Sequence, residues 1–160
     1  MNGLRPWPRT LGVITPSGVC GTMRAKIHGS TVELDESYLG TGTEAVRRQV
    51  EEYERGDRTA FDVEVRYPDT FTGRVMRAMV AIPYGETRTY GELAAELETS
   101  PVAVGQACGR NPVPLVVPCH RVVGAGGRLG GFSAEGGVEL KRRLLDEEAA
   151  NRQATLAAFE

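Results

Sequence analysis

The chain places one of its three cysteines, Cys119, directly before one of its two histidines, His120, at the end of an apolar stretch. A thiolate is a strong nucleophile, and a nearby histidine can act as the base that removes the thiol proton. A cysteine in an apolar run is more often a buried structural residue. In an extended segment neighbouring side chains point to opposite sides, so contact between these two would need a turn or a bridging water.

The other two cysteines, Cys20 and Cys108, are predicted to be structural, in a strand and on a helix face. The three are widely spaced and form no CxxC pair, which argues against a disulfide framework and fits a reducing compartment. Because His28 and His120 are the two histidines of the sequence, the spacing of a tetrahedral zinc site is not available locally, and we expect no metal.

Length and composition are those of a globular protein with one good-sized domain or two small ones, since 41% of the 160 residues are hydrophobic and 25% charged. No apolar stretch reaches the roughly 20 residues of a membrane helix, and the N-terminus lacks the apolar centre of a signal peptide. We therefore expect a cytoplasmic protein. The net charge of −2 argues against strong non-specific attraction to nucleic acid, although residues 71–145 carry nine Lys and Arg against six Asp and Glu.

The elements that must position the Cys-His pair begin with a β-rich first third. Three strands separated by turn residues are predicted, at Thr10–Ile14, Val19–Ile27 and Thr31–Leu34. Apolar residues on one side of Glu44–Arg55 predict a helix, and the alternation in Phe61–Tyr67 predicts a half-buried strand. Residues 1–68 are therefore predicted to form a small α/β N-terminal domain.

From Thr70 the hydrophobic period becomes helical, with an apolar stripe that ends before Pro83. Thr89-x-x-Glu92 has the spacing of a capping box, and Ser100-Pro101 offers an N-cap followed by proline at the first helical position. The two short helices that follow these caps give a helix-turn-helix pattern, which is also common in proteins that do not bind DNA.

The remaining segments alternate between irregular and helical patterns. Three prolines make Asn111–Pro118 extended but unsuitable as a central strand. Residues 124–137 are rich in glycine and predict a loop, and Val138–Glu148 predicts an amphipathic helix. We therefore predict an α+β chain in which a mostly helical C-terminal domain spans residues 69–150 and a short tail spans 151–160.

Several motifs occur together in the order found in one protein family. PCHRV (Pro118–Val122) follows Asn111-Pro112 and precedes a glycine-rich stretch and GGVELKRRLL. Upstream lie IPYGETRTYGELA and, more faintly, EEYERGDRTAFDVEV. From about Val50 to Glu148 the chain resembles the O6-alkylguanine-DNA alkyltransferases, the methylated-DNA–protein-cysteine methyltransferases. Several ordered motifs are more specific than one short pattern.

The resemblance implies a mixed α/β N-terminal domain and a C-terminal domain with a winged helix-turn-helix. It implies DNA repair: binding of alkylated DNA, double- or single-stranded, through the minor groove, and flipping of the damaged guanine. The O6-alkyl group then passes irreversibly to a cysteine of the protein, with O4-alkylthymine as a further candidate lesion. The thioether product cannot be displaced by water, so each molecule acts once. We expect no cofactor, no membrane association, no obligate protein partner and a monomer.

Carried over by position, Cys119 would be the acceptor, His120 the base acting through a water, and Glu148 the group that orients His120. Asn111 would hold the active-site turn. Tyr90 would lie near the target phosphate and base, where a hydroxyl can donate a proton to the leaving guanine. The residues expected to contact DNA or to line the guanine pocket are Val102, Arg110, Arg121, Val122, Ala134 and Glu135.

Two positions depart from the family pattern. Val102 stands where members usually have an arginine that fills the space left by the flipped base, and Ala134 stands where some relatives have tyrosine, which predicts a roomier pocket. The main alternative is a non-catalytic, alkyltransferase-like lesion-binding protein, but such proteins replace the acceptor cysteine, usually with tryptophan. A cysteine hydrolase would turn over repeatedly, whereas a transferase saturates at one alkyl group per molecule.

Overall fold

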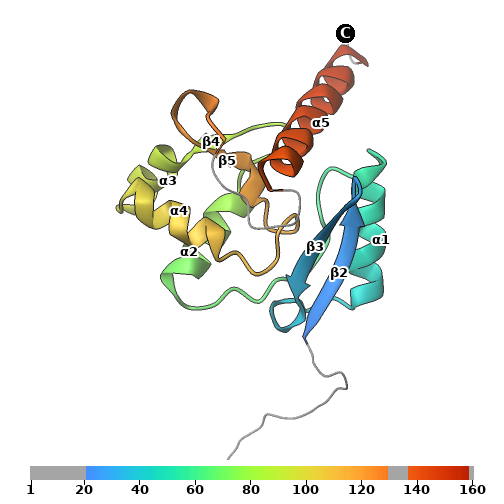
Figure 1. The fold of residues 1–160 in the computed structure, drawn as a ribbon, viewed down its shortest axis with the longest axis horizontal. Helices are drawn as coiled ribbons and strands as arrows, with labels where there is room; N and C mark the ends of the chain where they lie inside the picture. Colours follow the sequence, from blue (N-terminus) through green and yellow to red (C-terminus); the bar gives the residue numbers. More distant parts are fainter. Residues whose placement is uncertain (1–20, 130–136, 159–160) are drawn as a thin grey trace, which may run out of the picture.

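The computed structural model describes residues 21–129 and 137–158, which form helices and two small sheets (Figure 1). The principal elements are β2 (Thr22–Ile27), β3 (Ser30–Asp35), α1 (Thr43–Glu54), α2 (Phe71–Val80), α3 (Tyr90–Leu97), α4 (Pro101–Gly109) and α5 (Gly137–Ala158). The hairpin β2–β3 and helix α1 lie on the right of this view, the short helices α2, α3 and α4 lie on the left, and the long helix α5 lies at the top right. The predicted strand Thr10–Ile14 lies outside the described residues.

The hairpin confirms the two strands predicted before and after Gly29. β2 and β3 pair antiparallel, with Met23 opposite Leu34 and Ala25 opposite Val32. Alternate side chains of both strands are buried, as expected for a sheet with one face on the core. Helix α1, predicted within one residue of its bounds, covers this buried face. The hairpin therefore serves as a support on which α1 is held.

The strand predicted at Phe61–Tyr67 is wrong. Its side chains alternate between half-buried and exposed as the pattern indicated, but only Val65 forms a bridge, to Leu39. The backbone N–H and C=O of Asp62 are both bonded to the side-chain amide of Gln49 on α1, at 2.8 and 3.0 Å. At Asp62 the side chain of Gln49 thus makes the two hydrogen bonds that the backbone of a neighbouring strand would make.

Helices α2, α3 and α4 pack against one another, and α3 and α4 begin at the predicted caps. The Thr89 and Glu92 side chains form the reciprocal capping box, and Ser100 caps α4 ahead of Pro101. Just before α3, the short strand β4 (Arg88–Thr89) pairs in parallel with β5 (Val122–Val123). This pairing ties the start of α3 to the segment that follows the Cys-His pair.

Helix α5 is longer than predicted, because it continues through the expected tail to Ala158. The sequence of residues 149–158, AANRQATLAA, is rich in strong helix formers. Contacts to the loop after α2 hold this extension: Asn151 donates to the Tyr84 hydroxyl at 3.0 Å, and Arg152 pairs with Glu86 at 3.0 Å. Among the described residues no helix is long and apolar enough to cross a membrane.

Candidate active site

The Cys-His pair lies in a turn rather than in extended chain. Residues Cys119–Arg121 form a single 3-10 turn, η3, after a proline-rich segment in which Leu115 adopts a left-handed backbone with φ 74°. A leucine in this region is strained by roughly 1–3 kcal/mol and needs its surroundings to hold it. The predicted condition for contact between the two side chains, a turn at this point, is therefore present.

Asn111 holds this segment with both ends of its amide. Its Nδ2 donates to the carbonyl of Val117 at 2.9 Å, and its Oδ1 accepts from the N–H of Val113 at 3.1 Å. An asparagine can do both because its side chain carries a donor and an acceptor. Burial raises the pKa of the Cys119 thiol, and a hydrogen bond from Asn111 partly offsets this rise.

His120 is fully buried and bonded to Glu148 of α5, with 2.8 Å between His120 Nε2 and Glu148 Oε2. An ionised carboxylate can only accept, so Nε2 carries the hydrogen in this pair. The other ring nitrogen, Nδ1, is buried without a hydrogen-bond partner in the described part of the chain. Burial lowers the pKa of His120, and Glu148 offsets this in part. The neutral ring thus leaves the Nδ1 lone pair available to accept a proton.

Arg121, predicted to contact DNA, is instead buried beside Glu148. Its Nε donates to Glu148 Oε1 at 2.9 Å, a terminal nitrogen donates to Oε2 at 3.0 Å, and the other donates to the Ile82 carbonyl at 2.8 Å. Burial acts to raise the pKa of Glu148, but the bonds and charges of His120 and Arg121 outweigh it and lower the pKa to about 2. The geometry makes Arg121 a fixed partner of the carboxylate.

Lys141 belongs to the same cluster, and the sequence reasoning missed it. This lysine is only 1% exposed, and its Nζ donates to the Tyr90 hydroxyl at 3.3 Å. Its charge lowers the pKa of the Cys119 thiol, which burial raises. The available signal was its position on α5, one residue from Leu140 and three from Leu144, on the apolar face.

Tyr90 and Cys108 complete the surroundings of the Cys119 thiol. Tyr90 is half-buried at the first position of α3, where burial raises its pKa to about 12. Cys108 is buried on α4 with its Sγ 3.6 Å from Met79 Sδ, and burial raises its pKa to about 12. Both side chains are therefore protonated at neutral pH.

The other predicted contact residues are dispersed. Val102 lies in the first turn of α4 and is 70% exposed, whereas Arg110 is exposed at the other end of that helix. Val122 is fully buried in β5. Ala134 and Glu135 lie outside the described residues.

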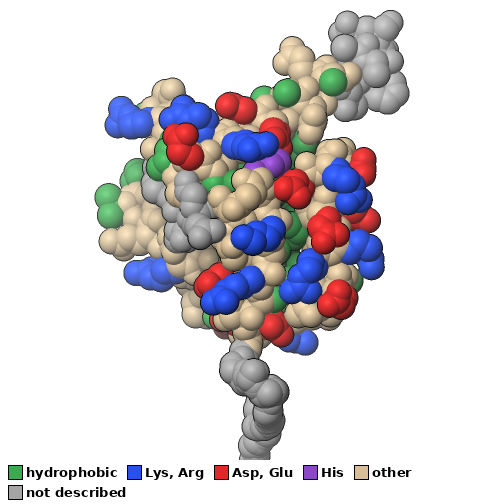
Figure 2. All heavy atoms as spheres, turned by 45° about the vertical axis from the view of Figure 1, so that its right-hand side comes forward, with side chains coloured by type: hydrophobic (Ala, Val, Ile, Leu, Met, Phe, Trp, Pro, Cys, Tyr) green, Lys and Arg blue, Asp and Glu red, His purple; other side chains and the backbone are tan. Residues whose placement is uncertain are grey.

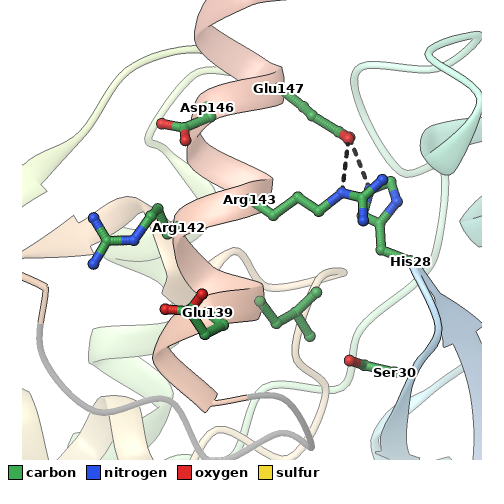
Figure 3. Close-up of a pocket in the computed structure, with 8 residues that line it drawn as sticks. His28, Ser30, Glu139, Arg142, Arg143, Asp146 and Glu147 are labelled. Atoms are coloured by element: carbon green, nitrogen blue, oxygen red, sulfur yellow. Dashed lines mark hydrogen bonds and ion pairs between the residues drawn. The ribbon is translucent and has the colours of Figure 1, made fainter.

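A separate hollow of about 380 Å³ lies between the hairpin and α5 (Figure 3). Its lining consists of His28, Ser30, Glu139, Leu140, Arg142, Arg143, Asp146 and Glu147, none of them predicted for the site. On the hairpin side of the molecule basic and acidic side chains are interspersed (Figure 2). Within residues 21–129 and 137–158, no group of three His, Cys, Asp or Glu could hold a metal ion.

Comparison with known proteins gives a consistent result. Residues 70–150 match the family described as 6-O-methylguanine DNA methyltransferase, DNA binding domain. A Mycobacterium bovis protein named methylated-DNA–protein-cysteine methyltransferase is 45% identical over 115 residues, which are 70% of this chain and 68% of the relative.

Two solved structures from Mycobacterium tuberculosis are similar in fold as well as in sequence. O6-methylguanine methyltransferase has a TM-score of 0.70 and 33% identity, covering 87% of this chain and 99% of that one. OGT in complex with DNA has a TM-score of 0.65 and 36% identity, covering 76% and 88%. The mixed helical and small-sheet architecture is therefore shared with these proteins.

Proposed function

This chain belongs to the family of methylated-DNA–protein-cysteine methyltransferases, and we propose that Cys119 is the cysteine to which it transfers the alkyl group. Family membership confirms the resemblance inferred from the sequence. The protein repairs DNA by moving the alkyl group of O6-alkylguanine onto itself, and a purely lesion-binding function is not favoured. The observation that supports Cys119 is its place in a turn beside a buried, hydrogen-bonded His120–Glu148 pair.

In the proposed reaction the Nδ1 lone pair of His120 accepts the thiol proton through a water molecule. Glu148 balances the charge of the resulting imidazolium across the 2.8 Å bond. The Cys119 thiolate then attacks the saturated carbon of the alkyl group. A carbon–sulfur bond forms, the bond between carbon and guanine O6 breaks, and its electron pair remains with the guanine.

Tyr90 and Lys141 are suited to neutralise that guanine. Because an ammonium group only donates, the Tyr90 oxygen accepts from Lys141, which leaves the hydroxyl hydrogen of Tyr90 to be donated to a different acceptor. A flipped guanine at this place would receive that hydrogen as negative charge develops on its ring. The Lys141 charge stabilises both the tyrosinate that would result and the attacking thiolate.

DNA would reach this site along the α3–α4 pair, which we propose as the helix-turn-helix of a winged DNA-binding domain. The exposed Val102 at the start of α4 would stand beside the flipped nucleotide, and Arg110 at its end would face phosphate. Arg121 would act through Glu148 rather than on DNA. We expect the protein to act as a monomer on alkylated single or double strands.

The test is intact-mass measurement after incubation with an O6-methylguanine duplex. Wild type should gain one methyl adduct, about 14 Da, and stop, because the thioether has no leaving group that water displaces. Cys119→Ala should gain none but still bind the lesion, and the matched control Cys108→Ala should react like wild type. An adduct mapped to Cys108, or several guanines repaired per molecule, would overturn the assignment.

A further inference from the structure

A side chain from the N-terminal half of the chain reaches the carboxylate that holds His120. The Tyr53 hydroxyl on α1 donates to Glu148 Oε2 at 2.5 Å across 95 residues of sequence. The same oxygen accepts from His120 Nε2 at 2.8 Å and from Arg121 at 3.0 Å. One carboxylate oxygen therefore serves three donors, of which only Tyr53 comes from outside the C-terminal half.

We propose that Tyr53 is a positioning residue for alkyl transfer: its hydroxyl fixes Glu148 and limits how strongly that carboxylate attracts the proton of His120. This inference rests on the proposed role of His120 as the base. It makes α1 part of the active site rather than only a neighbour of it.

The physical reason is competition for one negatively charged oxygen. Each hydrogen bond to a carboxylate draws off part of its charge, so a third donor weakens its hold on an imidazolium. Without the Tyr53 hydroxyl, Glu148 would stabilise protonated His120 more strongly and raise its pKa. The base would then be occupied by a proton over more of the acidic range. The other charged or titratable groups around the His120–Glu148 pair would stay: Arg121, Lys141 and Cys119 near His120, and Tyr84 near Glu148.

The Tyr53 hydroxyl is a permanent donor. Tyr53 is only 5% exposed, and both burial and the charge of Glu148 raise its pKa, so its hydroxyl keeps its hydrogen at neutral pH. Its ring stacks on Phe61 at 5.5 Å and meets Tyr84 edge-on at 6.1 Å. These ring contacts do not need the oxygen, so phenylalanine can keep the packing and remove only the hydrogen bond.

A second series of contacts runs from α1 through the hairpin turn to α5, beside the first one. Glu54, the next residue of α1, accepts from the backbone N–H of His28 at 2.6 Å. The ring of His28 in turn meets Glu147, the residue before Glu148, at 2.8 Å, with Arg143 on the same carboxylate (Figure 3). Because these contacts do not involve Tyr53, α1 should stay in place when the Tyr53 hydroxyl is removed.

The experiment compares pH profiles of single-turnover transfer for wild type, Tyr53→Phe and the matched control Tyr67→Phe, whose ring lies against Arg77 at 4.3 Å. Tyr53→Phe should react about 3–10-fold more slowly at acidic pH and nearly normally at alkaline pH, the scale expected for one hydrogen bond to a charged group. Its acid limb should move to higher pH, and that of Tyr67→Phe should not move.

A ring-fluorinated tyrosine at position 53 keeps the shape and donates more strongly, so its acid limb should move to lower pH. If the pH profile of transfer keeps its shape in both Tyr53→Phe and the fluorotyrosine variant, even if these proteins are less stable, Tyr53 does not have the proposed role. The adduct is mapped in every sample, which keeps the two proposals apart. Absence of an adduct at Cys119 in wild type would refute the acceptor assignment instead.

Discussion

Replacing Glu148 with glutamine tests whether this side chain is a buried anion whose charge stabilises the fold by binding His120 and Arg121. The change keeps the shape but leaves the Arg121 guanidinium, now bonded to both carboxylate oxygens, without a charged partner. Removing one member of a buried ion pair costs about 3–5 kcal/mol. The lowering of the Glu148 pKa from 4.5 to about 2 gives an independent figure of about 3 kcal/mol, at about 1.4 kcal/mol per unit. We expect Glu148→Gln to lose about 3 kcal/mol of unfolding free energy at pH 7.

The same pKa fixes how this loss depends on pH. A carboxyl group whose pKa is lower in the folded state contributes its full stability above the unfolded-state value and loses it as the pH falls toward the folded-state value. The deficit of Glu148→Gln should therefore be constant from pH 7 to pH 5 and shrink by about 2 kcal/mol between pH 5 and pH 3.

Urea unfolding at each pH measures this, with Glu147→Gln as the matched control. Glu147 is 38% exposed, so its loss should cost less than about 1 kcal/mol. A deficit for Glu148→Gln that stays the same down to pH 3 would refute the reasoning. A loss of unfolding free energy for Glu148→Gln that is no larger than the loss for Glu147→Gln would also refute it.

Two further predictions concern Lys141 and Val102. Lys141→Met should slow transfer about 10-fold, because the lysine charge lowers the pKa of Cys119, yet the variant should unfold at higher urea, because that charge is unfavourable to bury. Single-turnover rates check the first expectation and urea unfolding checks the second. An unchanged rate would exclude Lys141 from the reaction. Val102→Arg should speed repair of duplex DNA several-fold and change single-strand repair little, because flipping a base out of a duplex costs a few kcal/mol that a longer cationic side chain partly offsets. The added charge should also steepen the salt dependence of DNA binding by about one phosphate contact. Equal duplex-to-single-strand rate ratios in wild type and variant would show that Val102 does not assist flipping.

Elements whose ends are encoded locally could be predicted from the sequence. Thr89 and Glu92 lie three residues apart and bond to the backbone of their own helix, so the start of α3 needs no distant contact. The strand expected at Phe61–Tyr67 failed for the opposite reason. Its alternation reported burial correctly, but its hydrogen-bond partners include Gln49 on α1, which no pattern within the segment can reveal.

The same distinction applies to the site. Cys119 and His120 were predicted for the site because they are adjacent in sequence, and the family resemblance added Glu148 and Asn111. Arg121 was expected among the substrate-binding residues, but its guanidinium is buried and paired with a carboxylate 27 residues away, which no local pattern reveals. Tyr53 lies still farther from Glu148 in sequence and has no local signal at all.

The burial of Cys119 is useful if each protein molecule accepts one alkyl group and is then inactive, because a thiol that reacts elsewhere is lost to repair. Burial raises the pKa of the thiol, and Asn111 and Lys141 offset this only in part, so the resting sulfur is protonated. Oxidants and stray electrophiles attack the thiolate, which means that a protonated, 5% exposed thiol is protected while no lesion is bound. On the roles proposed above for Cys119 and His120, the rate of transfer then depends on the base that removes the thiol proton once the alkyl carbon is in place. With that role for His120, we expect the bonds that set its basicity, from Glu148 and through it from Arg121 and Tyr53, to affect the rate of repair more directly than the exposure of the sulfur does.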